Sequence, residues 1–76
     1  MVHAFIMVKT AAGRSEDVLA AVRELDRISE AHVVAGEFDV IVEADADEVY
    51  DVLQVSSSDI SGMDGVADTK TYMAID

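Results

Sequence analysis

Alternation between apolar and polar side chains predicts four extended strands in this chain. Residues 2–9 place aliphatic side chains at every second position, which is the period of a strand with one buried face. The same period recurs over residues 30–35, 38–44 and 66–75. Gly36 separates the second strand from the third. Because a glycine can adopt a positive φ at little cost, we expect a tight hairpin turn at this position.

A helical period follows the first strand. The predicted helix begins at Ser15 and ends near Arg27. Its first turn carries Glu16 and Asp17, which the positive end of the helix dipole favours. Apolar residues at helical spacing form the expected buried stripe, which consists of Val18, Leu19, Ala21, Val22 and Leu25.

A second helix is predicted between the third and fourth strands. Residues 45–48 have the spacing of a capping box, in which side chains at a helix start bond to free backbone N–H groups. The helix is expected to fray over residues 56–58 and to be followed by a glycine-bracketed turn. Its expected buried residues are Val49, Val52 and Leu53.

This order of elements predicts an α+β fold of the ferredoxin-like βαββαβ type. A four-stranded antiparallel sheet, in the order 4-1-3-2, would carry both helices on one face. The 76 residues suffice for one domain, spanning residues 1–76. The strands carry apolar residues on both faces, so we expect the second face to pack against another copy in a homodimer of the dimeric α/β barrel type. The alternative is that polar residues keep this face in water.

Charge and composition narrow the class of partner. Sixteen acidic against five basic residues give a formal net charge of −11, which disfavours direct nucleic-acid binding. The absence of cysteine excludes disulfides and thiolate metal sites. No apolar run reaches the roughly 18–20 residues of a membrane span and no basic signal-peptide start is present, so we expect a cytoplasmic protein. The acidity fits a halophilic source, and an ordinary acidic domain is the alternative.

Asp39, Thr69 and Thr71 come closest to forming a binding site. One carboxylate and two hydroxyls can fix the ammonium and carboxylate groups of a small zwitterion. In the predicted strand order the third strand does not neighbour the fourth, so these residues would converge only if different subunits contributed them. The ligand would then lie at an interface. The alternative is that Asp39 is solvated and the threonines are ordinary strand residues.

Other candidate sites have simpler interpretations. His3 and His32 are expected on strands without a second ligand at metal-binding spacing. Residues 59–65 resemble a calcium loop only superficially, because the spacing of oxygen ligands is wrong, and they predict a turn. Ser56, Ser57 and Ser58 lack a nucleophile elbow and a predicted histidine base. We therefore predict no catalytic residue, metal or cofactor.

Two motifs, in this order, resemble a known family. Residues 36–39 (Gly-Glu-Phe-Asp) match a Gly-x-aromatic-Asp hairpin, and residues 65–72 match a Gly-Val-x-x-Thr-x-Thr last strand. Both are similar to motifs in the effector domain of Lrp/AsnC transcriptional regulators, the RAM domain, and the resemblance covers the whole chain. Met63 and Asp64 stand before Gly65 where many members of that family have a proline, so the turn here is expected to be looser.

The resemblance implies a ligand, an assembly and a role for five residues. Members of the family bind amino acids between dimers, and their dimers often form rings such as octamers. By similarity, Asp39 would be the polar anchor and Gly36 would permit close backbone approach. Thr69, Thr71 and Tyr72 would complete the pocket.

One departure from the family shapes the predicted function. Members usually carry an N-terminal helix-turn-helix domain, whereas this sequence starts at the first effector strand. We therefore predict a stand-alone module with no DNA-binding domain, which regulates transcription indirectly by ligand-dependent assembly with itself or with full-length Lrp/AsnC regulators. Two alternatives stay open. One is a small monooxygenase-like enzyme that uses His3 or His32, and the other is a ligand-free structural oligomerisation module.

Overall fold

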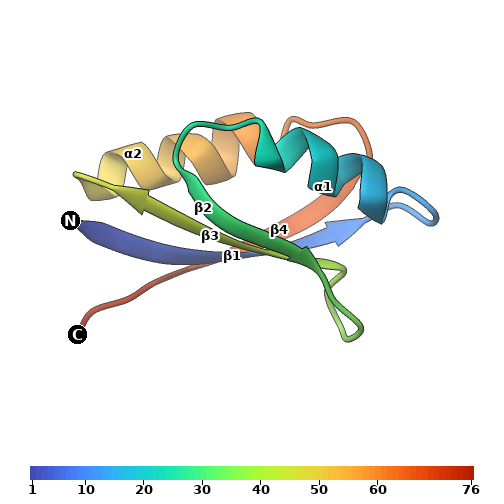
Figure 1. The fold of residues 1–76 in the computed structure, drawn as a ribbon, viewed down its shortest axis with the longest axis horizontal. Coiled ribbons are helices and arrows are strands. Elements are labelled where there is room, and N and C mark those ends of the chain that lie inside the picture. The colour runs from blue at the N-terminus through green and yellow to red at the C-terminus, as the bar shows by residue number, and fades with distance from the viewer.

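The computed structural model describes residues 1–56 and 58–76. An antiparallel four-stranded sheet carries its helices on one face (Figure 1). The elements in chain order are β1 (Val2–Thr10), α1 (Ser15–Arg23), β2 (Ile28–Val33), β3 (Val40–Ala46), α2 (Val49–Leu53), which continues as the π-helix η1 (Gln54–Ile60), and β4 (Val66–Met73). The strand order β2-β3-β1-β4 confirms the predicted ferredoxin-like topology.

The hydrophobic core lies between the sheet and the helices. Alternate residues of β1 and β3 are buried, and their partners in the sheet share that face, as Val8 opposite Val40 and Ile6 opposite Val42 illustrate. The main buried cluster is Ile6, Val8, Val18, Val22, Ala31, Val40, Val42, Ala44, Val55 and Ile60. The central strands therefore follow the predicted two-residue period, and the structure shows which of their two faces lies under the helices.

The other side of the sheet, which no helix covers, is called the open face. Its centre is apolar: Met7 lies opposite Ile41, and Phe5 lies opposite Tyr72, which is 53% exposed. Towards the end of the sheet near the N-terminus, the open face becomes polar, with His3 opposite Asp45. A single protomer thus leaves a mixed apolar and charged surface in water.

The first helix is shorter than predicted. α1 ends at Arg23, four residues before the expected end, and the chain then turns, with the Leu25 N–H donating to the Val22 carbonyl at 3.0 Å. Val18 and Val22 are buried as expected, but Ala21 is exposed. Early termination lets the chain reverse and enter β2 at Ile28, two residues before the predicted strand.

The second helix departs further from its prediction. The capping box is wrong, because Asp45 and Ala46 still belong to β3 and Glu48, the N-cap residue, makes no side-chain cap bond. Val52 is buried as expected, but Val49 is 51% and Leu53 is 46% exposed. The helix does not fray at Ser56, which is buried, but widens into η1; Ser57 lies outside the described residues.

The widened turn explains the shifted pattern of buried residues. A π-helix has more residues per turn than an α-helix, so the inward face moves along the sequence. Val55 and Ile60 are the inward residues of η1, and both contribute to the main core. The predicted buried residues, Val49, Val52 and Leu53, follow the spacing of a regular α-helix, which η1 does not have.

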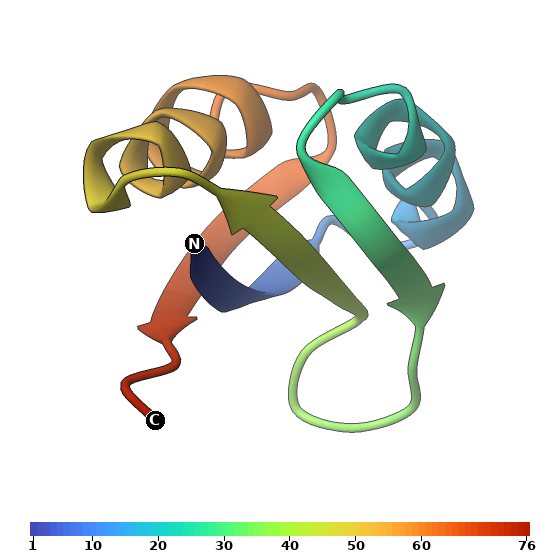
Figure 2. The ribbon, with the colours of Figure 1, turned by 60° about the vertical axis from the view of Figure 1, so that its left-hand side comes forward.

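The connection between β2 and β3 is longer than a tight hairpin. It spans residues 34–39 and projects away from the helices as an open loop (Figure 2). The Val34 N–H closes the loop by donating to the Asp39 carbonyl at 2.9 Å. Among the described residues only Gly13 and Gly65 have a positive φ, so the predicted positive φ at Gly36 is wrong: a loop of this length does not need it.

Within the part of the chain that the structure describes, no helix has the length and apolar character needed to cross a membrane.

Candidate functional site

Asp39 holds the end of β1 against the start of β3. Its Oδ2 atom accepts hydrogen bonds from the Thr10 backbone N–H at 2.8 Å and from the Thr10 hydroxyl at 3.2 Å. The backbone N–H of Thr10 lowers the pKa of Asp39, partial burial opposes this effect, and the Thr10 hydroxyl and the Lys9 charge add to the decrease. Asp39 is therefore ionised, and it holds β1 in place through its hydrogen bonds to Thr10. Its Oδ1 atom has no hydrogen-bond partner among the described residues.

The motif residues of β4 are divided between the two faces of the sheet. Thr69 and Thr71 lie opposite Val8 and Ile6, which face the helices. The Thr69 hydroxyl is 3.1 Å from the Ser61 hydroxyl. Tyr72 lies on the open face. Neighbouring residues of a strand point to opposite faces, so Tyr72 cannot line the same intrachain pocket as Thr71.

A single protomer does not gather the five predicted site residues. β1 lies between β3 and β4, which separates Asp39 from Thr69 and Thr71 as the sequence analysis expected. Gly36 is in an exposed loop, where an added Cβ atom would meet no other atom within 4 Å. None of the five residues lines the hollow beside β2 or the smaller hollow described below. Ligand contact by these residues stays a prediction, and it requires a second protomer.

Gly65, which begins the second motif, is required by the fold itself. Its φ is +94°, and an added Cβ atom would lie 3.2 Å from the Arg14 Cβ and the Val18 Cγ2 atoms. Its carbonyl accepts from the Ala11 N–H at 2.8 Å, which fixes the start of β4 beside the end of β1. This glycine therefore needs no ligand to explain it.

A cross-strand ion cluster lies at the polar end of the open face. His3 Nδ1 is 2.5 Å from Asp45 Oδ1, and His3 Nε2 is 3.0 Å from Glu43 Oε1. The hydrogen bond to Asp45 is the largest cause that raises the pKa of His3, and the same bond lowers the pKa of Asp45. The sequence placed His3 on a strand but missed its partners, which depend on the cross-strand register.

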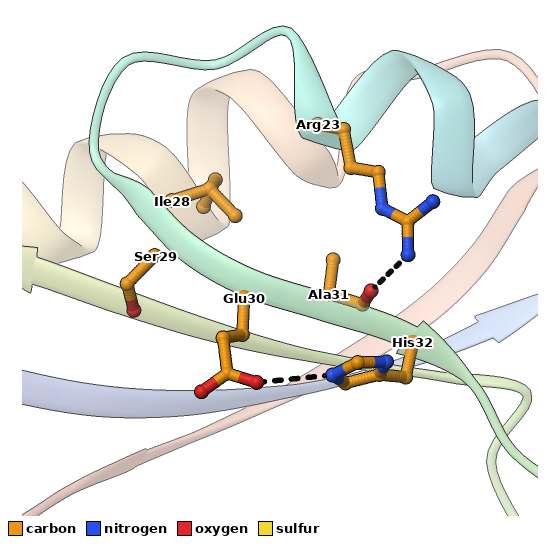
Figure 3. A pocket seen from close by; sticks show the side chains of 6 residues that line it. All are labelled: Arg23, Ile28, Ser29, Glu30, Ala31 and His32. Atoms are coloured by element: carbon orange, nitrogen blue, oxygen red, sulfur yellow. Dashed lines mark hydrogen bonds and ion pairs between the residues drawn. The ribbon is translucent and has the colours of Figure 1, made fainter.

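The larger hollow lies beside the edge strand β2 and was not predicted. It has a volume of about 360 Å³ and is lined by Arg23, Ile28, Ser29, Glu30, Ala31 and His32 (Figure 3). Arg23 Nη2 donates to the Ala31 carbonyl at 2.8 Å, and His32 Nε2 is 3.1 Å from Glu30 Oε1. Sequence reasoning did not single out Arg23 as a lining residue; the available signal was the position of the second strand at the edge of the predicted sheet.

The positions of the histidine and acidic side chains bear on metal binding. Across residues 1–56 and 58–76, no three histidine or acidic side chains are placed to hold a metal ion together. The smaller hollow, of about 180 Å³, is lined by Glu24, Leu25, Asp26, Arg27, Val55 and Asp59.

Comparison with known proteins assigns the fold to a family. The family model of the Lrp/AsnC ligand binding domain matches residues 3–76. This chain belongs to the Lrp/AsnC ligand-binding domain family. The resemblance stated from the two motifs is confirmed, and the matched family is a ligand-binding domain.

Individual Lrp/AsnC relatives agree with this assignment. The leucine-responsive regulatory protein of Haemophilus influenzae is 28% identical over 61 residues, which are 80% of this chain and 37% of that protein. The chain thus spans little more than a third of this curated relative. PHS023 from Pyrococcus horikoshii is 37% identical, with a TM-score of 0.90, and covers 99% of this chain and 90% of its own.

A further structure with the same fold was solved with an amino acid. The transcriptional regulator NMB0573 of Neisseria meningitidis, solved as an L-Met complex, superposes with a TM-score of 0.88 over 99% of this chain and 50% of its own. At 21% identity this likeness concerns the fold.

Proposed function

We propose that this chain is a cytoplasmic amino-acid-sensing effector domain whose ligand binds between protomers and shifts their assembly. The observation that carries the proposal is the match of residues 3–76 to the Lrp/AsnC ligand binding domain. The L-Met complex of the N. meningitidis regulator, which shares the fold, supports an amino acid as the class of ligand.

The proposed pocket combines the 34–39 loop of one protomer with β4 of another. The free Oδ1 atom of Asp39 would accept from the ligand's ammonium group, while Oδ2 stays bonded to Thr10. The Thr71 hydroxyl, which has no hydrogen bond among the described residues, would serve the ligand's carboxylate together with Thr69. The open surroundings of Gly36 leave room for backbone contact from a neighbour.

The open face supports a dimer as the basic unit. Phe5, Met7 and Ile41 form its apolar centre, and exposed Tyr72 extends it. Covering this area removes apolar surface from water, and each Å² buried stabilises the dimer by about 25 cal/mol. Homodimers would then join into a ring such as an octamer.

Ligand binding at a protomer interface provides the regulatory step. An amino acid that binds one assembly better than another shifts the population towards that assembly. Action on DNA would come through full-length Lrp/AsnC proteins that assemble with it. We assign no catalytic residue, because the matched family is a ligand-binding domain.

The test is solution mass and thermal melting with each of the twenty amino acids, at low and at high salt. We expect one or a few amino acids to change the mass or raise the melting temperature. Thr71→Val should abolish the response without changing the fold, and Glu16→Gln, at an exposed position of α1 away from the open face, is the control. A chain indifferent to all twenty amino acids would contradict the proposal and favour a ligand-free assembly module.

A further inference from the structure

We propose that the free edge of β2 pairs with the same edge of a second copy, antiparallel and centred on Ala31. This contact differs from the open-face contact and does not depend on the proposed ligand. Its partner is a second copy of this chain, and the following observations select both the edge and the register.

β2 is an edge strand whose outward backbone groups lack a strand partner. The Val34 N–H donates to the Asp39 carbonyl at the β3 side of the chain, whereas the Ala31 carbonyl accepts from Arg23 on the opposite side. Alternation along a strand then points the backbone groups of Ala31 and Val33 outward. Exposed edges of this kind are templates for pairing with another strand.

The edge is recessed where a second strand would lie. Figure 3 shows Arg23 reaching down from α1 on one side of β2, with Glu30 and His32 on the other side. The hollow beside them has a volume of about 360 Å³, and Ala31 is one of the residues that line it. It therefore offers an approach to the backbone groups from the side of the sheet.

The sequence of β2 is self-complementary about Ala31. Antiparallel pairing across a two-fold axis at Ala31 places Glu30 opposite His32 of the second copy, and His32 opposite its Glu30. Both side chains point to the open face and are 60% exposed, so both pairs can form. A two-fold axis at Glu30 would instead place two glutamates opposite each other, which is unfavourable. Charge complementarity thus selects the register centred on Ala31.

Arg23 competes with this pairing. In the single chain its guanidinium bonds to the Ala31 carbonyl, the group that would accept from Ala31 N–H of the second copy. Arg23 also lacks a carboxylate partner among the described residues, unlike Arg14 and Arg27. Removal of Arg23 should therefore free the carbonyl and strengthen the association, the opposite of the usual result of deleting a side chain at a contact.

The contact has a consequence for larger assemblies. Edge pairing is isologous, as is the proposed open-face dimer, and one chain with two isologous contacts links dimers to further dimers. The edge would then be the joint between dimers.

The first test is amide hydrogen exchange as a function of protein concentration at high salt. We expect the amides of Ala31 and Val33 to become protected as concentration rises, while the outer-edge amides of β4 keep exchanging at the same rate. Exchange at Ala31 and Val33 that does not depend on concentration would overturn the proposal. Concentration-dependent protection of β4 together with β2 would also overturn it, because β2 would then be pairing with β4 of the second copy.

Charge-swap variants provide the second test, with sedimentation as the readout. His32→Glu should raise the dissociation constant of the edge contact at least roughly 2- to 30-fold, the range for two lost cross-strand pairs, because it also places glutamates opposite each other. The double variant Glu30→His/His32→Glu should restore it, and Arg23→Gln should lower it. Arg27→Gln is the control for charge alone, since Arg27 lies 3.8 Å from Asp51 and outside the hollow. Failure of the double variant to recover would contradict the assigned register.

Discussion

Gly36 and Gly65 begin the two motifs of this chain, and their surroundings differ. Gly65 has a positive φ of +94° and is crowded by Arg14 and Val18. Gly36 has no positive φ, and nothing lies within 4 Å of its absent Cβ atom. The fold explains the first glycine, whereas any need for the second must come from outside the chain.

The polar residues of the two motifs also differ in how many of their side-chain atoms are bonded within the fold. Asp39 is half committed to the fold, because its Oδ2 atom holds Thr10 while its Oδ1 atom is free. The Thr69 hydroxyl bonds to the Ser61 hydroxyl, but the side chains of Thr71 and Tyr72 form no hydrogen bond within the described residues. Gly36, Thr71 and Tyr72 are therefore the positions where loss of binding can be separated from loss of folding.

The largest effect on stability is expected at Gly65. Gly65→Ala forces an alanine into the left-handed region and against two side chains, which should lower the free energy of unfolding by about 1–3 kcal/mol. The melting temperature should fall by roughly 4–8 °C per kcal/mol. Denaturant unfolding checks this, with Gly13→Ala as a partner that has positive φ without crowding. An unchanged midpoint for Gly65→Ala would remove the contrast with Gly36.

Replacing Asp39 should change how the stability of the chain depends on pH in the acid range. Its pKa is lower in the folded chain than in the unfolded chain, so its contribution is present above the unfolded value, near 3.8, and is lost as the pH falls through the folded value. Asp39→Asn should be less stable than the parent at neutral pH, and the two should converge in acid. Melting temperatures between pH 2 and 7 measure this. Parallel curves would show that the carboxylate charge does not support Thr10.

His3, outside both motifs, gives the opposite pH dependence. Its pKa is higher in the folded chain, so its contribution is present below the unfolded value of 6.5 and is lost as the pH rises through the folded value. The parent should lose stability above neutral pH, and His3→Gln should flatten this part of the profile. Equal slopes for parent and variant would exclude the His3 pairs with Asp45 and Glu43 as its cause.

The smallest effects on stability are expected at Gly36 and Thr71. Gly36→Ala should leave stability unchanged or raise it by about 0.4–1 kcal/mol, because the alanine restricts only the unfolded chain. Thr71→Val keeps the shape of the side chain and removes a hydroxyl without a described partner. Both variants should nevertheless lose the amino-acid response in thermal melts. A destabilised Gly36→Ala chain would indicate an intrachain role for this glycine.

The sequence was sufficient for the topology and for the buried faces of the central strands. Val8, Val40 and their alternating neighbours follow a two-residue period that depends only on local geometry. The second helix was mispredicted, because Asp45 continues β3 and because η1 changes the helical period. Neither departure leaves a local signal in the spacing of apolar residues.

The candidate site was only partly predictable for a similar reason. Strand order alone implied that Asp39 and Thr71 do not meet in one chain, and the structure agrees. The bond from Asp39 to Thr10, the pairing of His3 with Asp45 and the hollow beside Ala31 depend on cross-strand register and on side-chain conformation. A single sequence does not specify these properties.

The most direct test of the shared site is complementation between two variants that do not bind. Gly36→Leu disables the loop, and Thr71→Val disables the strand, so each homogeneous assembly should lose the amino-acid response of the parent. If loop and strand come from different protomers, refolding equal amounts of the two chains together should restore about a quarter of the parent's sites by random mixing. Binding measured by calorimetry should recover to that fraction. A mixture that binds no more than either variant alone would contradict a site shared between protomers.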